Sequence, residues 1–176
     1  MKTITDPKIM QLLQRFSTIQ EEAWLVGGCV RDMLMERELH DYDITTSAPP
    51  DVVIKLFQSA GYRVVPTGLK HGTVTVLADK EPVEITTYRT ESGYIHHRKP
   101  QEVSFTRSLD EDLKRRDFTM NAIAWHPVHG FHDPFHGRED IEKKCIRCVG
   151  DASLRMKEDA LRILRALRFH CTRSEE

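Results

Sequence analysis

The stretch that decides the fold is Leu25-Val26-Gly27-Gly28-Cys29-Val30-Arg31-Asp32, followed after a short connection by Asp41-Tyr42-Asp43. An apolar segment over residues 23–26 is typical of a strand, and helical spacing of apolar residues begins directly after the two glycines. Glycines at such a turn let the backbone approach a phosphate closely, and Arg31 adds a forked donor. Taken alone, a Gly27-Gly28 pair more often marks only a tight turn.

Two carboxylates follow on a predicted strand over residues 42–46. Because side chains two residues apart on a strand point to the same face, Asp41 and Asp43 would repel each other unless a cation lay between them. Such a pair suits one or two Mg²⁺ ions that also contact substrate phosphates. Glu84, on another predicted strand, could supply a third carboxylate. The alternative interpretation is a solvated strand end.

Two groups of arginines accompany these acids. Arg115-Arg116-Asp117-Phe118 ends a predicted charged helix over residues 109–116, and Asn121 follows. Arginines beside a metal–carboxylate site would grip triphosphate oxygens, although an ordinary charged helix end has the same composition. Further along, a periodic helix predicted over residues 157–170 carries arginines three residues apart, which form one oblique stripe. These are Arg162, Arg165 and Arg168.

Asp159 and Arg162 are three residues apart on that predicted helix and would lie side by side. Aspartate only accepts hydrogen bonds and arginine only donates them, so the pair complements a base edge with an amino group beside a ring acceptor. Cytosine and adenine present that edge, whereas uracil presents a carbonyl where the carboxylate needs a donor. A simple salt bridge between the two residues is the alternative interpretation.

Composition limits the classes of function. The chain has 176 residues, 39% of them hydrophobic, and a net charge of −1, which argues against disorder and against a polybasic binder. Residues 138–173 nevertheless carry ten Lys and Arg against six acids, which fits contact with a polyanion. No apolar run is long enough for a membrane span and no signal core is present, so we expect a cytoplasmic location.

Cysteines and histidines raise the question of a metal site. Cys145 and Cys148 have CxxC spacing, but no second pair of ligands follows at the usual distance, so we expect two small side chains in a strand. His126, His129, His132 and His136 cluster around a predicted hairpin. No hydrolase pattern of carboxylates accompanies them, so we expect surface or structural histidines.

Strands and helices mix without strict alternation, which predicts an α+β domain with a mixed or mostly antiparallel sheet. We expect helices over residues 7–16 and 50–60, strands over 62–65, 73–77 and 83–88, and an irregular, mobile loop over 89–108. A hairpin is predicted within residues 122–132. The apolar face of the last helix needs a partner, so we expect the chain to be the front part of something larger.

Taken together, the motifs resemble class II tRNA nucleotidyltransferases, the bacterial CCA-adding enzymes and their poly(A) polymerase relatives. The Gly-Gly and Asp-Tyr-Asp segments are similar to the first family motif, and residues 115–122 to the second. Asp133-Pro134 with Gly137 is similar to the linker motif, and residues 158–162 with Arg165 to the nucleotide-selecting motif. The resemblance covers about residues 20–170. The family often has an acid at the position of His96, in the loop that helps the switch from C to A addition.

The resemblance implies a polymerase-β-like catalytic head over residues 1–137 and, over 138–176, a linker with the first part of a helical neck. It implies transfer of CMP and AMP from CTP and ATP to the 3′ end of tRNA by a two-metal mechanism that releases pyrophosphate. Asp41 and Asp43 would hold Mg²⁺, with Glu84 as a third acid. The nucleotide would be bound by Gly27, Gly28, Arg31, Arg116, Asp117, Asn121, Asp159, Arg162, Arg165 and Arg168.

Alternatives within and outside that family remain open. A bacterial poly(A) polymerase shares all four motifs, and an enzyme that adds only CC or only A is a further possibility. A truncated, non-catalytic nucleotide- or RNA-binding remnant is the alternative from another class. The oligomeric state is not determined by the sequence.

Overall fold

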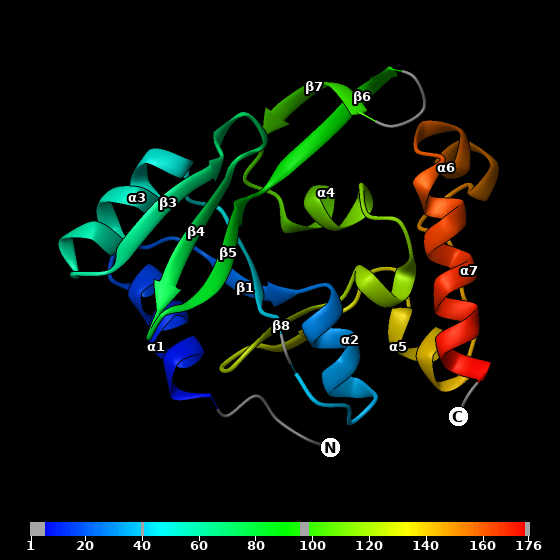
Figure 1. Ribbon diagram of the computed structural model, residues 1–176, viewed down its shortest axis with the longest axis horizontal. Helices are drawn as coiled ribbons and strands as arrows, with labels where there is room; N and C mark the ends of the chain where they lie inside the picture. The colour runs from blue at the N-terminus through cyan, green and yellow to red at the C-terminus, as the bar shows by residue number, and fades with distance from the viewer. Residues whose placement is uncertain (1–5, 40, 96–98, 175–176) are drawn as a thin grey trace.

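The molecule is built on one mixed sheet, described here in a computed structural model that covers residues 6–39, 41–95 and 99–174. Among these residues, seven strands follow the order β3-β4-β5-β2-β1-β8-β9 (Figure 1). Only β2 and β5 of these neighbours pair in parallel. The expected α+β class with a mixed sheet is confirmed. The strands are β1 (Ala23–Val26), β2 (Asp43–Thr46), β3 (Arg63–Gly68), β4 (Thr73–Ala78), β5 (Glu81–Thr87), β8 (Ala124–His126) and β9 (Gly130–His132).

Three helices cover one face of the sheet (Figure 1): α1 (Pro7–Ser17), α2 (Gly28–Leu34) and α3 (Pro50–Ser59). The first begins as its sequence predicts, because the Asp6 carboxylate accepts a hydrogen bond from the Lys8 amide at 3.0 Å and proline follows the cap. Their apolar stripes bury against inward-facing strand residues such as Leu25 and Ile85, both fully buried. This cluster is the main core of the domain.

The opposite face is covered by α4 (Leu109–Lys114), whose N-cap Ser108 accepts from the Glu111 amide. Leu113 packs there against Val26, which follows Leu25 on β1 and therefore points to the other side of the sheet. A third cluster joins the last part of the chain to the sheet through Phe118 and Phe169, whose rings meet edge to face at 5.8 Å.

The C-terminal part of the described chain contains α5 (Gly137–Glu142), α6 (Ala152–Glu158) and α7 (Leu161–Ser174). α5 is held against the short 3₁₀ helix η2 (Thr119–Asn121), where the Thr119 hydroxyl donates to the buried Asp140 carboxylate at 2.7 Å. Asp133 lies four residues before α5 and accepts from the amides of Gly137 and Arg138 at 2.7 and 2.9 Å, while His136 is the N-cap residue. The linker motif therefore supplies hydrogen-bond acceptors to the first turn of α5.

The expectation for the segment 89–108 needs correction. Instead of an irregular loop, β6 (Arg89–Ile95) and β7 (Lys99–Phe105) form a two-stranded antiparallel hairpin of their own. These strands are polar and separate from the main sheet, so the sequence has no alternating apolar pattern that would predict them. His96 lies outside the described residues.

The predicted continuous helix over residues 157–170 is also wrong. α6 ends at Glu158, and Asp159 has an extended backbone with φ −142° and ψ 108°. The Asp159 carboxylate accepts from the Leu161 amide at 2.9 Å, so it caps the start of α7 instead of continuing α6. Apolar periodicity does not reveal such a break, because the helical spacing resumes after two residues.

The CxxC segment is not a strand. Cys148 is buried and contributes a single isolated bridge to Phe118, whereas Cys145 lies in the irregular connection after α5. The histidines of the β8–β9 hairpin have a structural role: the rings of His126, His129 and His132 surround Trp24 at 5.3–6.1 Å between centroids.

Most of the apolar residues expected on the last helix are exposed. Leu161, Leu164 and Leu167 have exposed fractions of 42–61%, whereas Phe169 is buried. None of the helices in the described part of the chain is long and apolar enough to cross a membrane.

Gly137 provides a test of this packing. A Cβ atom added there would lie 2.1 Å from the Thr119 carbonyl oxygen, a backbone atom that cannot rotate away. We predict that Gly137→Ala lowers the free energy of unfolding by about 1–3 kcal/mol in urea denaturation. The control is Glu139→Ala on the exposed side of the same helix, expected to leave the free energy of unfolding nearly unchanged. Equal effects of the two substitutions would contradict this account.

Candidate active site

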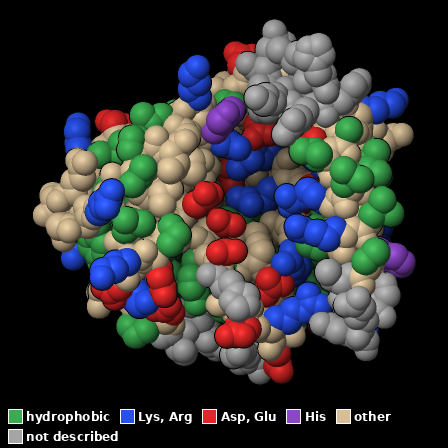
Figure 2. Space-filling model, in the orientation of Figure 1, with side chains coloured by type: hydrophobic (Ala, Val, Ile, Leu, Met, Phe, Trp, Pro, Cys, Tyr) green, Lys and Arg blue, Asp and Glu red, His purple; other side chains and the backbone are tan. Residues whose placement is uncertain are grey.

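A polar cavity of about 520 Å³ lies between the sheet and α7. Figure 2 shows Lys and Arg side chains gathered inside this hollow, with acidic side chains along its rim. Its wall comes from several separate parts of the chain, which only the fold brings together. The cavity is lined by Gly27, Gly28, Arg31, Asp43, Arg89, Glu91, Arg115, Arg116, Asp117, Asn121, Asp159, Arg162, Arg165, Arg168 and Phe169.

The floor is the turn that connects β1 to α2. Gly27 has φ +77°, a conformation that residues with a side chain rarely adopt, and it forms the N-cap of α2. The position of a Cβ at Gly27 would be 3.6 Å from both an Asp43 carboxylate oxygen and an Arg116 guanidinium nitrogen. The bare backbone therefore faces the point where an acid and an arginine converge.

Of the three predicted acids, Asp43 and Glu84 lie on neighbouring strands and Asp41 does not, and only Asp43 lines the cavity. Asp43 begins β2 and is directly opposite Glu84 in the parallel pairing with β5. Asp41 precedes the strand and is exposed, as is Glu84. Burial raises the pKa of Asp43 and the charge of Arg116 lowers it, while the negative charges of Glu84 and Asp41 raise it. The net effect is a pKa above its ordinary value. A cation at this position would relieve the repulsion.

Arg116 is the cation that lowers the pKa of that acid. One nitrogen of its guanidinium donates to Asp112 at 3.1 Å, and the side chain is 18% exposed. Its buried Nε has no hydrogen-bond partner among the described residues. A buried donor without a partner is unfavourable, so this group has unused capacity for an oxyanion.

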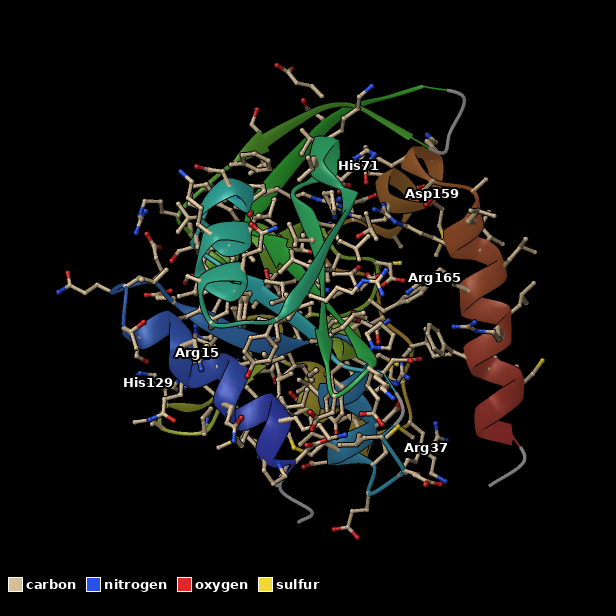
Figure 3. The ribbon with its side chains drawn as sticks, turned by 60° about the vertical axis from the view of Figure 1, so that its left-hand side comes forward. Arg15, Arg37, His71, His129, Asp159 and Arg165 are labelled. Atoms are coloured by element: carbon tan, nitrogen blue, oxygen red, sulfur yellow. The ribbon has the colours of Figure 1, made fainter. Side chains whose placement is uncertain are left out.

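A chain of polar contacts runs along the opposite wall. Arg31 donates to the Asn121 side-chain oxygen at 2.9 Å, and the Asn121 amide donates to Asp117 at 3.2 Å. Asp117 in turn forms an ion pair with Arg165 at 2.7 Å. Figure 3 shows Arg165 extending from α7 toward the sheet. The pair connects the segment between α4 and η2 to α7.

The predicted base-reading pair needs a correction in its geometry. Asp159 and Arg162 are on either side of the helix break, not one above the other on a continuous helix, although both line the cavity. Figure 3 shows Asp159 at the junction of α6 and α7. Arg162 is 6% exposed and donates to Glu158 at 2.7 Å and to the Arg155 carbonyl at 2.9 Å. Its ion partner here is therefore Glu158, an acid for which we predicted no role.

The structure brings together most of the site residues that the sequence predicts. All ten predicted nucleotide-binding residues line the cavity, and Asp43 joins them. Arg89, Glu91 and Phe169 line it as well and were not predicted. The first two lie on β6, in the segment expected to be an irregular loop, and Arg89 pairs with Glu91 at 2.8 Å. No local pattern marks them, because their place depends on how the hairpin meets α4.

Comparison with known proteins places this geometry in context. Residues 23–147 match the Poly A polymerase head domain. The chain is 53% identical over 163 residues to the CCA-adding enzyme of Lactobacillus helveticus. The aligned region covers 92% of this chain and 40% of that protein. The chain thus spans about 40% of the length of the curated relatives that it matches.

Solved structures show the same likeness. The Bacillus stearothermophilus CCA-adding enzyme in complex with CTP superposes with a TM-score of 0.82 at 43% identity, covering 94% of this chain and 39% of that one. A tRNA nucleotidyltransferase complexed with a primer tRNA and an incoming ATP analogue has a TM-score of 0.72 at 34% identity, covering 90% and 44% of the two chains.

The raised pKa of Asp43 has a consequence for stability. The folded chain holds this proton to a higher pH than the unfolded chain does, so stability falls as pH rises from the unfolded pKa through the folded one. We predict that Asp43→Asn raises the thermal midpoint at pH 7 by about 2–4 °C and that the gain vanishes below the unfolded pKa. Differential scanning calorimetry across pH measures it.

The matched control is Asp51→Asn, which changes an acid in the exposed first turn of α3. It should leave the midpoint nearly unchanged. A lower midpoint for Asp43→Asn at pH 7 would contradict the assignment of net repulsion to this carboxylate.

Proposed function

Because the chain belongs to the Poly A polymerase head domain family, we propose that it is a nucleotidyltransferase. It would transfer CMP and AMP from CTP and ATP to the 3′ end of tRNA, in CCA addition or repair. The observation that carries this proposal is one cavity that unites Asp43, Arg116 and Arg162. Asp43 provides a carboxylate, and Arg116 provides a buried guanidinium donor that has no partner in the described part of the chain. Arg162 provides, together with Asp159, the donor and the acceptor that a base edge requires. We place the reaction in the cytoplasm.

The triphosphate would bind over the Gly27-Gly28 turn. The bare backbone there leaves room for phosphate oxygens, and the unpaired Nε of Arg116 supplies a charge-assisted hydrogen bond. Arg31 and Arg165 border the same space, held by Asn121 and Asp117. With the nucleotide so placed, the 3′ hydroxyl of the RNA attacks the α-phosphate and pyrophosphate leaves.

We propose a divalent cation, Mg²⁺, as the cofactor. Among the described residues, no group of three or more His, Cys, Asp or Glu side chains is arranged to hold a metal ion. Asp41 and Asp43 would therefore hold the ion together with phosphate oxygens of the nucleotide, as Mg²⁺ commonly binds, and Glu84 would stand beside them as a third acid. Bound metal supplies Lewis acidity for the attacking hydroxyl and the leaving pyrophosphate.

Base selection would fall to the junction of α6 and α7. Asp159 accepts and Arg162 donates, which complements the amino group and ring nitrogen of cytosine or adenine. Arg168 borders the same cavity, and its guanidinium lies 5.1 Å from the centre of the Phe169 ring. The division that we propose is a catalytic head over residues 1–137 and a linker with the first part of a neck over residues 138–176.

An extension assay tests the proposed activity. The chain is incubated with Mg²⁺, CTP, ATP or both, and a tRNA transcript that ends at its discriminator base, and the products are resolved to one nucleotide. We expect addition of C, CC or CCA. Long A tracts would instead favour a poly(A) polymerase, the alternative that the family's own name supports. No addition by a chain that is folded and still binds CTP would favour a non-catalytic remnant.

The carboxylates provide a sharper test of the chemistry. We predict that Asp41→Ala lowers nucleotide incorporation by about 100-fold or more, because a ligand of the proposed cation is lost, and that it abolishes Mg²⁺-dependent CTP binding. The control is Asp51→Ala, an exposed acid on α3 that does not line the cavity, which should retain parental activity. Activity of Asp41→Ala equal to that of the parent would rule out this assignment.

Asp159 allows a test of base selection with little change in shape. Asn at this position keeps an oxygen for the Leu161 amide but adds an N–H group that can donate to O4 of uracil. We predict that Asp159→Asn lowers the preference for CTP over UTP by about tenfold. Single-nucleotide incorporation with each triphosphate measures the ratio.

The matched control is Asp151→Asn, which changes the N-cap of α6, an exposed residue that does not line the cavity. Its nucleotide preference should remain parental. An unchanged preference in Asp159→Asn would show that this carboxylate does not read the base.

A further inference from the structure

Asp112, on α4, is a fully buried carboxylate that does not line the cavity. Its Oδ1 accepts from Arg115 at 2.9 and 3.0 Å and from the Arg89 amide at 3.2 Å. Its Oδ2 accepts from Arg116 at 3.1 Å and lies 3.0 Å from the Thr45 hydroxyl. Both oxygens are thus satisfied, as a buried carboxylate requires.

This acid remains charged in the interior. Burial by itself raises the pKa of Asp112, but the charges and hydrogen bonds of Arg116 and Arg115 outweigh burial and hold the pKa below its ordinary value. A buried charge with several charge-assisted hydrogen bonds fixes the orientation of its partners closely.

The partners of Asp112 belong to three elements that border the cavity. Thr45 lies on β2 two residues after Asp43, so the two side chains share a face of the sheet. Arg116 follows α4, and Arg89 begins the β6–β7 hairpin. Arg115 makes a second connection, because it also pairs with the nearly buried Glu91 of β6 at 3.0 Å.

We propose that Asp112 is a positioning residue that holds Arg116 at the place where it meets the triphosphate, and that it ties this arginine to the acid-bearing strand and to the base of the hairpin. This rests on the proposed function. Without the charge on Asp112, Arg116 loses its ion partner and can turn toward Asp43, whose carboxylate lies beside the same turn. The triphosphate then meets a guanidinium that is no longer oriented for it.

Asp112→Asn tests the proposal, since it keeps the shape of the side chain and removes its charge. We expect calorimetric binding of CTP to weaken by about tenfold while binding of cytidine stays within about twofold. A general loosening of the fold would weaken both ligands alike. The control is Asp110→Asn, an exposed acid on the same helix whose partner is His132.

A double-mutant cycle separates action through Arg116 from an independent effect. If Asp112 acts through this arginine, Arg116→Gln with Asp112→Asn should weaken CTP binding no more than Arg116→Gln alone does. Fully additive losses, or parental CTP binding by a folded Asp112→Asn chain, would overturn the inference. Should Asp112→Asn fail to fold, Thr45→Val removes one partner of Oδ2, and a selective loss of CTP binding is expected there too; parental CTP binding by Thr45→Val would overturn it.

The same experiment distinguishes this inference from the proposed function. A parent chain that binds neither CTP nor ATP would overturn both. A parent chain that binds CTP in an Mg²⁺-dependent manner, with an Asp112→Asn variant that binds it equally well, would overturn only the role of Asp112.

Discussion

The pairing of β1 with β2 is the constraint on which the rest of the site depends. The two strands run antiparallel with Leu25 opposite Ile44. This register brings the glycine turn at the end of β1 beside the first residue of β2, where Asp43 stands. A shift by one residue would move the carboxylate to the other face and expose Ile44, which is buried in the main core. Burial of apolar side chains thus sets the place of the acid.

Around Asp43 and the glycine turn, most of the arginines that line the cavity form an ion pair with a nearby acid. Arg31 pairs with Asp32, Arg162 with Glu158, and Arg165 with Asp117. Ion pairs of this kind add little net stability, but they hold long side chains in place. Two groups are less well compensated. The carboxylate of Asp43 is crowded by other acids, and the buried Nε of Arg116 has no hydrogen-bond partner in the described part of the chain, although another nitrogen of this guanidinium donates to Asp112. Both border the same cavity, so these two unmet interactions converge on one ligand site.

The helical break at Asp159 illustrates how local and tertiary requirements combine. A continuous helix would satisfy the apolar spacing, but Asp159 is a strong helix-starting residue and its carboxylate caps α7. The break separates α6 from α7 and lets Arg162 pack inward against Glu158 while Asp159 keeps a partly exposed place in the cavity. A periodicity argument identified both residues as partners but placed them wrongly, because it assumes unbroken geometry.

The sequence by itself determined the elements whose causes are local: the capped first helix, the glycine turn, the α+β class and the set of chemically competent residues. It also determined that these residues form motifs in a recognisable order. Only the tertiary structure decided which of them meet. The β6–β7 hairpin, the roles of Arg89 and Glu91, and the burial of Asp112 all depend on contacts between residues distant in the chain. Such contacts produce no periodic pattern in the sequence, because each partner lies among ordinary polar residues there. The partners acquire their function only when folding brings them together and removes the water between them.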